Sequence, residues 1–203
     1  DGKSAGRFYG WISGRNRIYL ILGVFAALVL LFYGNTLGNG FVHDDIGQIV
    51  LNKHVQSLQY LPKVVTGCIW EYELGDCVMY YRPVQTLSYL LAYQLSSQPP
   101  LFHILNLTYF AIAVFLVFLF IKKLTGNILV SFLTALFFLI HPINSEVVNW
   151  ISAVPELTFT IFVLLSAIFY ISWRQSGKKA GKISRKKFNW KTLRLLDTHK
   201  KLL

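Results

Sequence analysis

The sequence has few charged residues, and among them few acids. Only 14% of its 203 residues are charged, with 9 Asp and Glu against 20 Lys and Arg. A soluble domain has about 25% charged residues. Hydrophobic residues make up 54% of the chain, and the mean hydropathy is positive. This composition excludes an ordinary soluble globular domain and favours a membrane protein.

Charge is absent from four apolar runs that are long enough to predict membrane-spanning helices. A helix crosses the ~30 Å hydrocarbon core with about 20 apolar residues. The runs predict spans at about 18–34, 101–121, 124–141 and 156–173. The first run ends in LLFYGNTLGNG, which is too bulky for a signal-peptide cleavage site, so we interpret it as a retained span. We therefore predict a single membrane domain, residues 1–203, folded as an all-α polytopic transmembrane bundle with four spans.

The distribution of charge predicts the orientation of these spans. All but three of the 20 basic residues lie in 1–17, in 122–123 or in 174–203, and basic clusters near spans mark the cytoplasmic side. All but two of the 9 acids lie in 35–100 or 141–157. We therefore predict an integral, multi-pass protein with both termini cytoplasmic and its active face extracytoplasmic, in the periplasm or the ER lumen. The cytoplasmic basic tail 174–203 is interpreted as a topology anchor touching anionic membrane lipids, and no nucleic-acid partner is predicted.

The predicted outer loop, 35–100, is too apolar for a plain linker. Within it, Pro83–Gln98 places leucines at helical spacing and predicts an amphipathic helix on the membrane surface or against the bundle. Val55–Val65 predicts a second, weaker helix broken at Pro62. Cys68 and Cys77 also lie in this loop, where they either form a disulfide or remain two separate thiols.

Two adjacent acids, Asp44 and Asp45, follow the first span closely. One interpretation is a solvated loop or an N-cap for a helix that begins at Ile46. The other is a carboxylate that acts as a general base or binds a metal. A divalent cation is not indicated, because a lone acidic pair lacks the number of ligands that such an ion needs. We therefore predict no cofactor and assign no metal ligand, and the use of a divalent cation stays open.

Arg82 opens the predicted helix of the outer loop, against the general rule that basic residues stay inside. It either pairs with an acid of the loop or binds a phosphate, because a guanidinium donates two hydrogen bonds at once. His103 and Asn106 are three residues apart and share a helix face at the outer end of the second span. They are either a polar pair in helix packing or residues that line a site.

His141 and Glu146 flank the proline that ends the third apolar run, and they either cap that helix or line the same site. All these candidates fall at span ends on the predicted outer face. That arrangement favours one site at the membrane surface, supplied by a lipid-borne substrate. A transporter is disfavoured, because transporters place polar groups near the bilayer midplane.

Four motifs carry a resemblance to a known family. They are GNGFVHDD at 38–45, YRPVQTLSYLLAYQL at 81–95, FHILN at 102–106 and HPINSEVVNWISAVPEL at 141–157. In this order they resemble the N-terminal part of membrane glycosyltransferases of the GT-C fold. The chain is most similar to the protein O-mannosyltransferase-like group that often carries tetratricopeptide repeats. The resemblance covers roughly residues 35–173 and implies a partial GT-C fold.

The resemblance implies a polyprenyl-phosphate sugar donor and inversion at the anomeric carbon. It assigns catalysis to Asp44 and Asp45 and binding of the donor phosphate to Arg82. His141 and Glu146 match a turn that the family also has. Together with His103 and Asn106, they remain candidates for lining the site. The implied partners are a lipid-linked sugar, a protein or glycan acceptor, and a missing C-terminal half or partner subunit, because the family has many more spans. The alternative is a non-catalytic membrane subunit or degenerate relative that binds a lipid-linked sugar or a partner protein.

Overall fold

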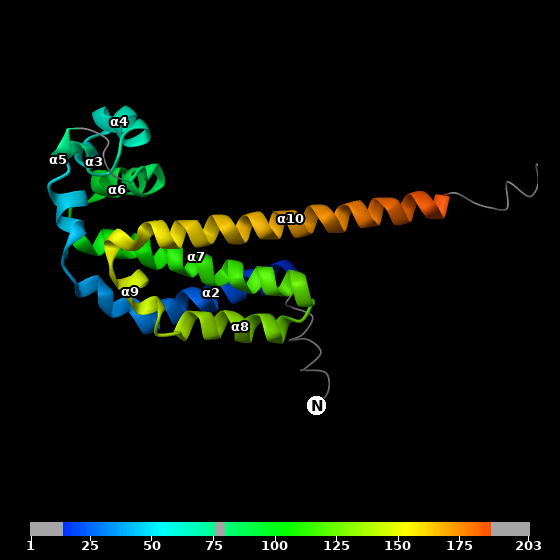
Figure 1. Ribbon diagram of the computed structural model, residues 1–203. Coiled ribbons are helices and arrows are strands. Elements are labelled where there is room, and N and C mark those ends of the chain that lie inside the picture. Colours follow the sequence, from blue (N-terminus) through cyan, green and yellow to red (C-terminus); the bar gives the residue numbers. More distant parts are fainter. Residues whose placement is uncertain (1–13, 76–79, 188–203) are drawn as a thin grey trace, which may run out of the picture. The chain divides into compact units, whose positions relative to one another are not determined.

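The computed structural model describes residues 14–75 and 80–187, and this part of the chain is helical, without β-strands (Figure 1). The chain forms two compact units, residues 1–165 and 166–203. Four short 3₁₀- or π-helical turns link the helices: η1 (Gly34–Gly38), η2 (Ile46–Val50), η3 (Leu58–Tyr60) and η4 (Ile151–Ala153). The α-helices are α2 (Gly14–Tyr33), α3 (Lys53–Gln56), α4 (Leu61–Thr66), α5 (Glu71–Leu74), α6 (Pro83–Leu95), α7 (Pro99–Thr125), α8 (Ile128–Ile140), α9 (Asn144–Asn149) and α10 (Val154–Lys187).

Within the described residues, three helical segments are long and apolar enough to cross a membrane: Arg17–Gly38, Pro99–Thr125 and Ile151–Ser176. The predictions of an all-helical fold and of a membrane protein are thus supported. The third predicted run, 124–141, contains α8, which has only 13 residues. At 1.5 Å per residue, α8 is about 20 Å long, shorter than the ~30 Å hydrocarbon core.

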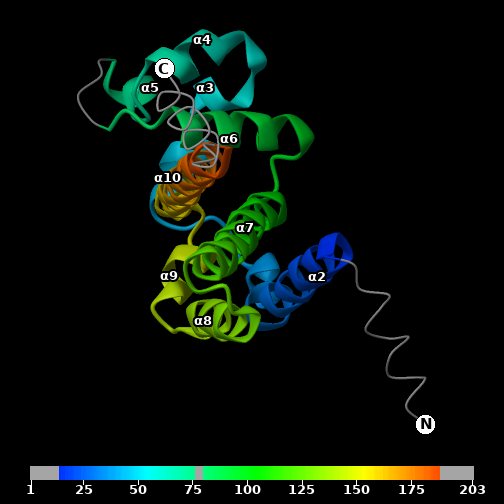
Figure 2. The ribbon, with the colours of Figure 1, turned by 90° about the vertical axis from the view of Figure 1, so that its right-hand side faces the viewer.

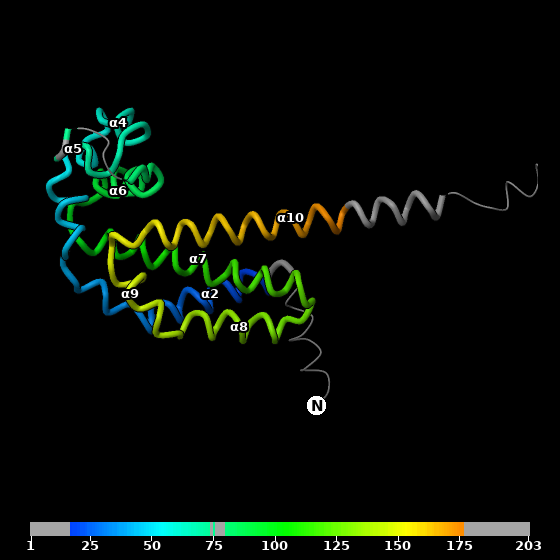
Figure 3. The backbone as a smooth tube through the Cα atoms, viewed as in Figure 1, coloured from blue at the N-terminus to red at the C-terminus, as the bar shows by residue number. Residues whose placement is uncertain are grey.

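Local sequence sets where α7 and α8 begin and end. Pro99 occupies the first turn of α7, where its missing N–H costs no hydrogen bond. Gly126 ends α7 in the left-handed conformation, with φ +72°, which glycine adopts without strain. The side chain of Asn127 then accepts hydrogen bonds from the N–H groups of Leu129 and Val130 and starts α8. The short turn makes α7 and α8 antiparallel neighbours (Figure 3).

An aromatic core holds α2, α7 and α8 together. The ring of Phe25 stacks on Phe132, with 5.2 Å between ring centroids, and contacts Phe118. Near the other end of α2, the Tyr33 hydroxyl donates to the carbonyl oxygen of Leu139 at 2.9 Å. The C-terminal ends of α2 and α8 therefore lie at the same end of this bundle.

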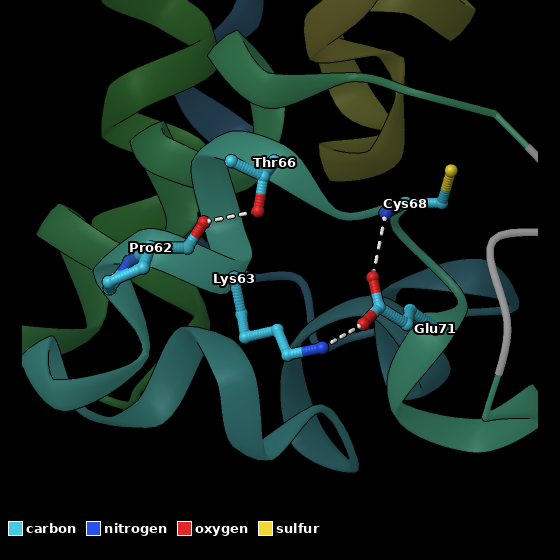
Figure 4. Close-up of polar contacts among 5 residues, drawn as sticks. All are labelled: Pro62, Lys63, Thr66, Cys68 and Glu71. Carbon is cyan, nitrogen blue, oxygen red and sulfur yellow. Dashed lines mark hydrogen bonds and ion pairs between the residues drawn. The ribbon is translucent and has the colours of Figure 1, made fainter.

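The segment between α2 and α7 folds into a lobe of short helices around α6 (Figures 1 and 2). Its core contains Ile49, Ile69 and Tyr89, and it is continuous with Phe102 at the start of α7. The predicted amphipathic helix is α6, which buries Leu90 and leaves Leu95 exposed. In the lobe, the Glu71 carboxylate joins the ammonium of Lys63, 2.6 Å away, to the backbone N–H of Cys68, 3.3 Å away (Figure 4).

The predicted helix at Val55–Val65 is wrong in its boundaries. The structure divides this stretch into α3, η3 and α4, and Pro62 does not break a helix but lies in the first turn of α4. The reason is that proline is pre-shaped for a first helical turn, where its N–H would have no partner. Cys68 is not a free thiol, whereas Cys77 lies outside the described residues, so the Cys68–Cys77 bridge stays a prediction. In the second unit, α10 continues as a helix to Lys187.

Candidate active site

A cavity of about 730 Å³ opens between two segments that are far apart in the sequence. Its volume lies within the range of about 300–1,000 Å³ that is usual for small-molecule sites. We call the residues from 39–44 the first wall and those from 145–150 the second wall. The cavity is lined by Asn39, Val42, His43, Asp44, Ser145, Glu146, Asn149 and Trp150.

The structure separates the two acids that follow the first span. Asp44 is exposed and lines the cavity, whereas Asp45 is completely buried and does not line it. Both residues belong to the helical turn that leads into η2, and neighbouring side chains on a helix point in different directions. The pair therefore cannot present both carboxylates to one cavity.

Asp45 accepts hydrogen bonds from three donors, one in the first wall and two in Ser152, which closely follows the second wall. One carboxylate oxygen, Oδ1, accepts the N–H of Ser152 at 2.9 Å and its hydroxyl at 2.5 Å. The other, Oδ2, accepts the N–H of Val42 at 3.1 Å. Burial raises the pKa of Asp45, while these bonds and the nearby imidazole of His103 oppose that rise. The N-cap interpretation is wrong for Asp45, because its side chain makes no capping bond to η2.

Arg82 lies outside this cavity. It is the residue before the first turn of α6, and its guanidinium carbon lies 4.5 Å from the centre of the Tyr80 ring. No ion pair to an acid is found for it within the described ranges 14–75 and 80–187, so the first interpretation of Arg82 has no support there. It lines a second, smaller cavity of about 180 Å³ with Pro83, Val84, Gln85, Pro155, Thr158, Phe159 and Phe162.

One residue connects the surroundings of the two cavities. The side-chain amide of Gln85, which lines the Arg82 cavity, donates to the carbonyl oxygen of Ser152 at 3.2 Å. Ser152 in turn donates to Asp45, the neighbour of Asp44. Arg82 and Asp44 thus belong to different cavities, and hydrogen bonds through Ser152, which lines neither cavity, connect Gln85 to Asp45.

His103 and Asn106 are buried and do not line the cavity, but they bond to the segments around it. The Nδ1 atom of His103 lies 3.0 Å from the hydroxyl of Thr36, which ties the start of α7 to η1. The side-chain amide of Asn106 donates to the carbonyl oxygen of Trp150 at 2.7 Å and fixes the second wall. Neither residue lines the 730 Å³ cavity. Their structure favours the interpretation as polar groups in helix packing.

His141 and Glu146 have different roles. His141 ends α8, and its Nδ1 accepts the N–H of Ile143 at 3.2 Å, which is a capping interaction outside the cavity. Glu146 is exposed in the first turn of α9 and lines the cavity with Asp44. The structure thus brings together Asp44 and Glu146 among the predicted site residues.

Several cavity residues were not among the candidates. His43 has a left-handed backbone, φ 48°, which histidine adopts more readily than most residues. The other lining residues that were not candidates are Asn39, Val42, Ser145, Asn149 and Trp150. These residues lie in the motifs GNGFVHDD and HPINSEVVNW, and that was the sequence feature that could have identified them. The spacing of residues along the chain does not show that the two motifs meet in the folded protein. Among the described residues, no group of three or more His, Cys, Asp or Glu is placed to hold a metal ion.

Comparison with known proteins gives the family. Human protein O-mannosyl-transferase TMTC3 is 33% identical over 156 residues, which are 75% of this chain and 16% of that protein. The chain is therefore a homologue of the protein O-mannosyl-transferases. Protein O-mannosyl-transferase F38B6.6 of Caenorhabditis elegans is 29% identical over 82% of this chain and 25% of its own length. Drosophila melanogaster Tmtc1, also named protein O-mannosyl-transferase, is 29% identical over 74% of this chain and 18% of its own length.

These matches confirm the resemblance that the sequence motifs predict. They support a glycosyltransferase family and a membrane protein. The chain spans only 16% to 25% of the length of these relatives. No protein-family model matches the chain, and no solved structure gives a significant match.

Proposed function

We propose that this chain carries part of the active site of a membrane glycosyltransferase. The enzyme transfers a sugar from a polyprenyl-phosphate donor to a hydroxyl of a protein or glycan. The names of the relatives favour mannose as the sugar and a protein as the acceptor. The observation that carries the proposal is the exposed carboxylate of Asp44 in a 730 Å³ cavity that also contains Glu146.

In this reaction the acceptor oxygen forms a bond to the anomeric carbon as the bond from that carbon to the donor phosphate breaks. Asp44 takes the proton of the acceptor hydroxyl, because a general base must be accessible and close to the proton that it removes. The polyprenyl phosphate leaves with the bonding electron pair. Glu146, in the second wall, accepts hydrogen bonds from sugar hydroxyls.

Arg82 is proposed to bind the phosphate of the donor. A guanidinium suits a phosphate because two of its N–H groups can bind two oxygens at once. The cavity of Arg82 is otherwise mostly apolar, with Phe159 and Phe162 from α10, which suits the first carbons of a polyprenyl chain. The phosphate would then lie beside Arg82 and Gln85, with the sugar directed toward the Asp44 cavity.

We also propose four spans and a partial GT-C fold, with both termini cytoplasmic. The Tyr33–Leu139 bond brings the C-terminal ends of α2 and α8 together, and the Thr36–His103 contact adds the start of α7. The Asp44 cavity lies at this end, whereas Lys122 and Lys123 lie in the last turn of α7, at its opposite end. This arrangement supports α8 as a crossing segment completed by its flanks.

Transfer by the full-length protein tests the proposal. We expect Asp44→Asn to abolish transfer from polyprenyl-phosphate mannose to an acceptor peptide while donor binding and the melting temperature stay near the wild-type values. Ser88→Ala is a matched control, since Ser88 bonds Tyr109 at 2.7 Å between α6 and α7, outside both cavities. Normal turnover by Asp44→Asn would exclude Asp44 as the base. Donor binding by the wild type without any transfer would favour the non-catalytic subunit.

A further inference from the structure

Asp45 joins the two walls of the 730 Å³ cavity, although the wall segments are more than a hundred residues apart. Ser152 and Asp45 are separated by 107 positions. Asp45 directly follows the first wall, and Ser152 closely follows the second. We propose that Asp45 is a positioning residue whose carboxylate clamps the walls together and so sets Asp44 against Glu146. Only the kinetic part of this inference depends on the proposed function.

One oxygen of the Asp45 carboxylate binds the first wall, and the other binds Ser152, which closely follows the second wall. Oδ2 accepts the N–H of Val42, which belongs to the first wall, and Oδ1 accepts the N–H and hydroxyl of Ser152. Hydrogen bonds to an ionised acceptor are about twice as strong as those between neutral groups. Because Asp45 has no exposed surface, its carboxylate is not accessible to the hydroxyl of a substrate.

The second wall is itself fixed to the helices behind it. Three successive carbonyl oxygens each accept a side-chain hydrogen bond: Trp150 from Asn106 at 2.7 Å, Ile151 from Tyr89 at 3.0 Å and Ser152 from Gln85 at 3.2 Å. The donors come from α6 and α7. η4 is therefore a fixed support for the second wall, and Asp45 attaches the first wall to it.

The clamp is selective for a carboxylate. An alanine at position 45 would leave the N–H groups of Val42 and Ser152 without their acceptors, and the loss costs about 1–3 kcal/mol at Ser152, whose N–H is buried. An asparagine keeps one oxygen that can accept the hydrogen bonds from Ser152. Its NH₂ group would face the N–H of Val42, and because both groups are donors, no hydrogen bond could form there. Asp45→Asn should therefore lose the hydrogen bond to Val42 in the first wall and keep those to Ser152. Asp45→Ala should lose the hydrogen bonds to both residues.

Amide hydrogen exchange measures the clamp without any transfer assay. In the full-length protein, we expect Asp45→Asn to accelerate exchange at Val42 by about tenfold or more, the equivalent of one lost hydrogen bond, with Ser152 near the wild-type rate. Asp45→Ala should accelerate exchange at both amides. Ser152→Ala keeps the backbone donor of residue 152, so it should accelerate exchange at both positions less than Asp45→Ala does. Asp44→Asn should leave exchange at both amides unchanged. Unchanged exchange at Val42 in Asp45→Asn and Asp45→Ala would overturn the clamp.

The kinetics separate positioning from direct catalysis. We expect Asp45→Asn to raise KM and retain measurable kcat, because the base is still present but displaced, while Asp44→Asn loses kcat. Combining Asp45→Asn with Ser152→Ala should change kcat/KM by less than the product of the single effects, since both weaken the same clamp, the first at Val42 and the second at Ser152. A fully active Asp44→Asn beside an Asp45→Asn variant with normal exchange and no turnover would make Asp45 the base. If Asp45→Ala fails to fold, the Asn and Ser152 variants still decide the outcome.

Discussion

The side-chain amide of Gln85 lies 3.2 Å from the carbonyl oxygen of Ser152 and 2.8 Å from the side-chain oxygen of Gln48. Gln85 and Gln48 are both almost fully buried. This contact joins α6, the helix that begins after Arg82, to the loop that Asp45 holds. The two cavities therefore depend on one network of hydrogen bonds. A substitution of Gln85, at the centre of this network, should change the geometry of both cavities.

The first prediction concerns Gln85→Leu, which keeps the apolar volume and removes the donor. The buried oxygens of Gln48 and Ser152 would lose their partner, at about 1–3 kcal/mol each. We expect a lower melting temperature in detergent and weaker donor binding. Gln94→Leu on the same helix is the control, because Gln94 is exposed and bonds only carbonyls near the surface. Equal melting temperatures for the two variants would contradict the prediction.

The second prediction uses the left-handed backbone of His43, φ 48°. Glycine adopts this region freely and asparagine tolerates it, whereas a β-branched residue there is a strained outlier. His43→Val should therefore destabilise the protein by about 1–2 kcal/mol, and His43→Gly or His43→Asn by much less. Thermal unfolding of the three variants checks the order. Because all three remove the imidazole, a stability loss that is equal in all of them would assign the effect to the side chain instead of the backbone.

The sequence predicts the long apolar helices well, because burial in lipid leaves a strong local signal. Pro99, Gly126 and Asn127 also mark helix ends by chemistry that is readable from single residues. The site is less predictable. Nothing local shows that Asp45 turns away from the cavity to meet Ser152, because that contact joins residues 107 positions apart. Arg82 was expected beside the acids, and only the folded chain separates it into its own cavity.

The third prediction concerns the Glu71–Lys63 pair in the lobe (Figure 4). The hydrogen bond from Lys63 is the main cause that lowers the pKa of Glu71 below its ordinary value of 4.5. A lowered folded-state pKa gives stability that is present above pH 4.5 and is lost as the pH falls through the folded pKa. Since Lys63 is largely exposed, the contribution is below about 1 kcal/mol.

Glu71→Gln should therefore lower the melting temperature at pH 7, and the difference from the wild type should disappear in acid. Raising the salt concentration should also reduce it, because salt screens exposed pairs. Glu73→Gln is the control on the same helix, since the exposed Glu73 carboxylate accepts only a long contact of 3.5 Å from Tyr72. A difference for Glu71→Gln that persists unchanged below the folded pKa would show that charge pairing is not its cause.

The fourth prediction concerns Gly67, which follows α4 and lies against the same pair. A Cβ atom at Gly67 would lie 2.7 Å from the backbone carbonyl oxygen of Lys63 and would also overlap the Glu71 carboxylate. Backbone cannot move aside as a side chain does, so Gly67→Ala must shift α4 or α5 at a cost of about 1–3 kcal/mol. Gly34→Ala is the control, because a Cβ there meets nothing within 4 Å. We expect faster proteolysis of the lobe in Gly67→Ala alone. Equal rates of proteolysis for the two variants would contradict this prediction. They would mean that the chain relaxes around the new methyl group and that the Glu71–Lys63 pair is kept with altered geometry.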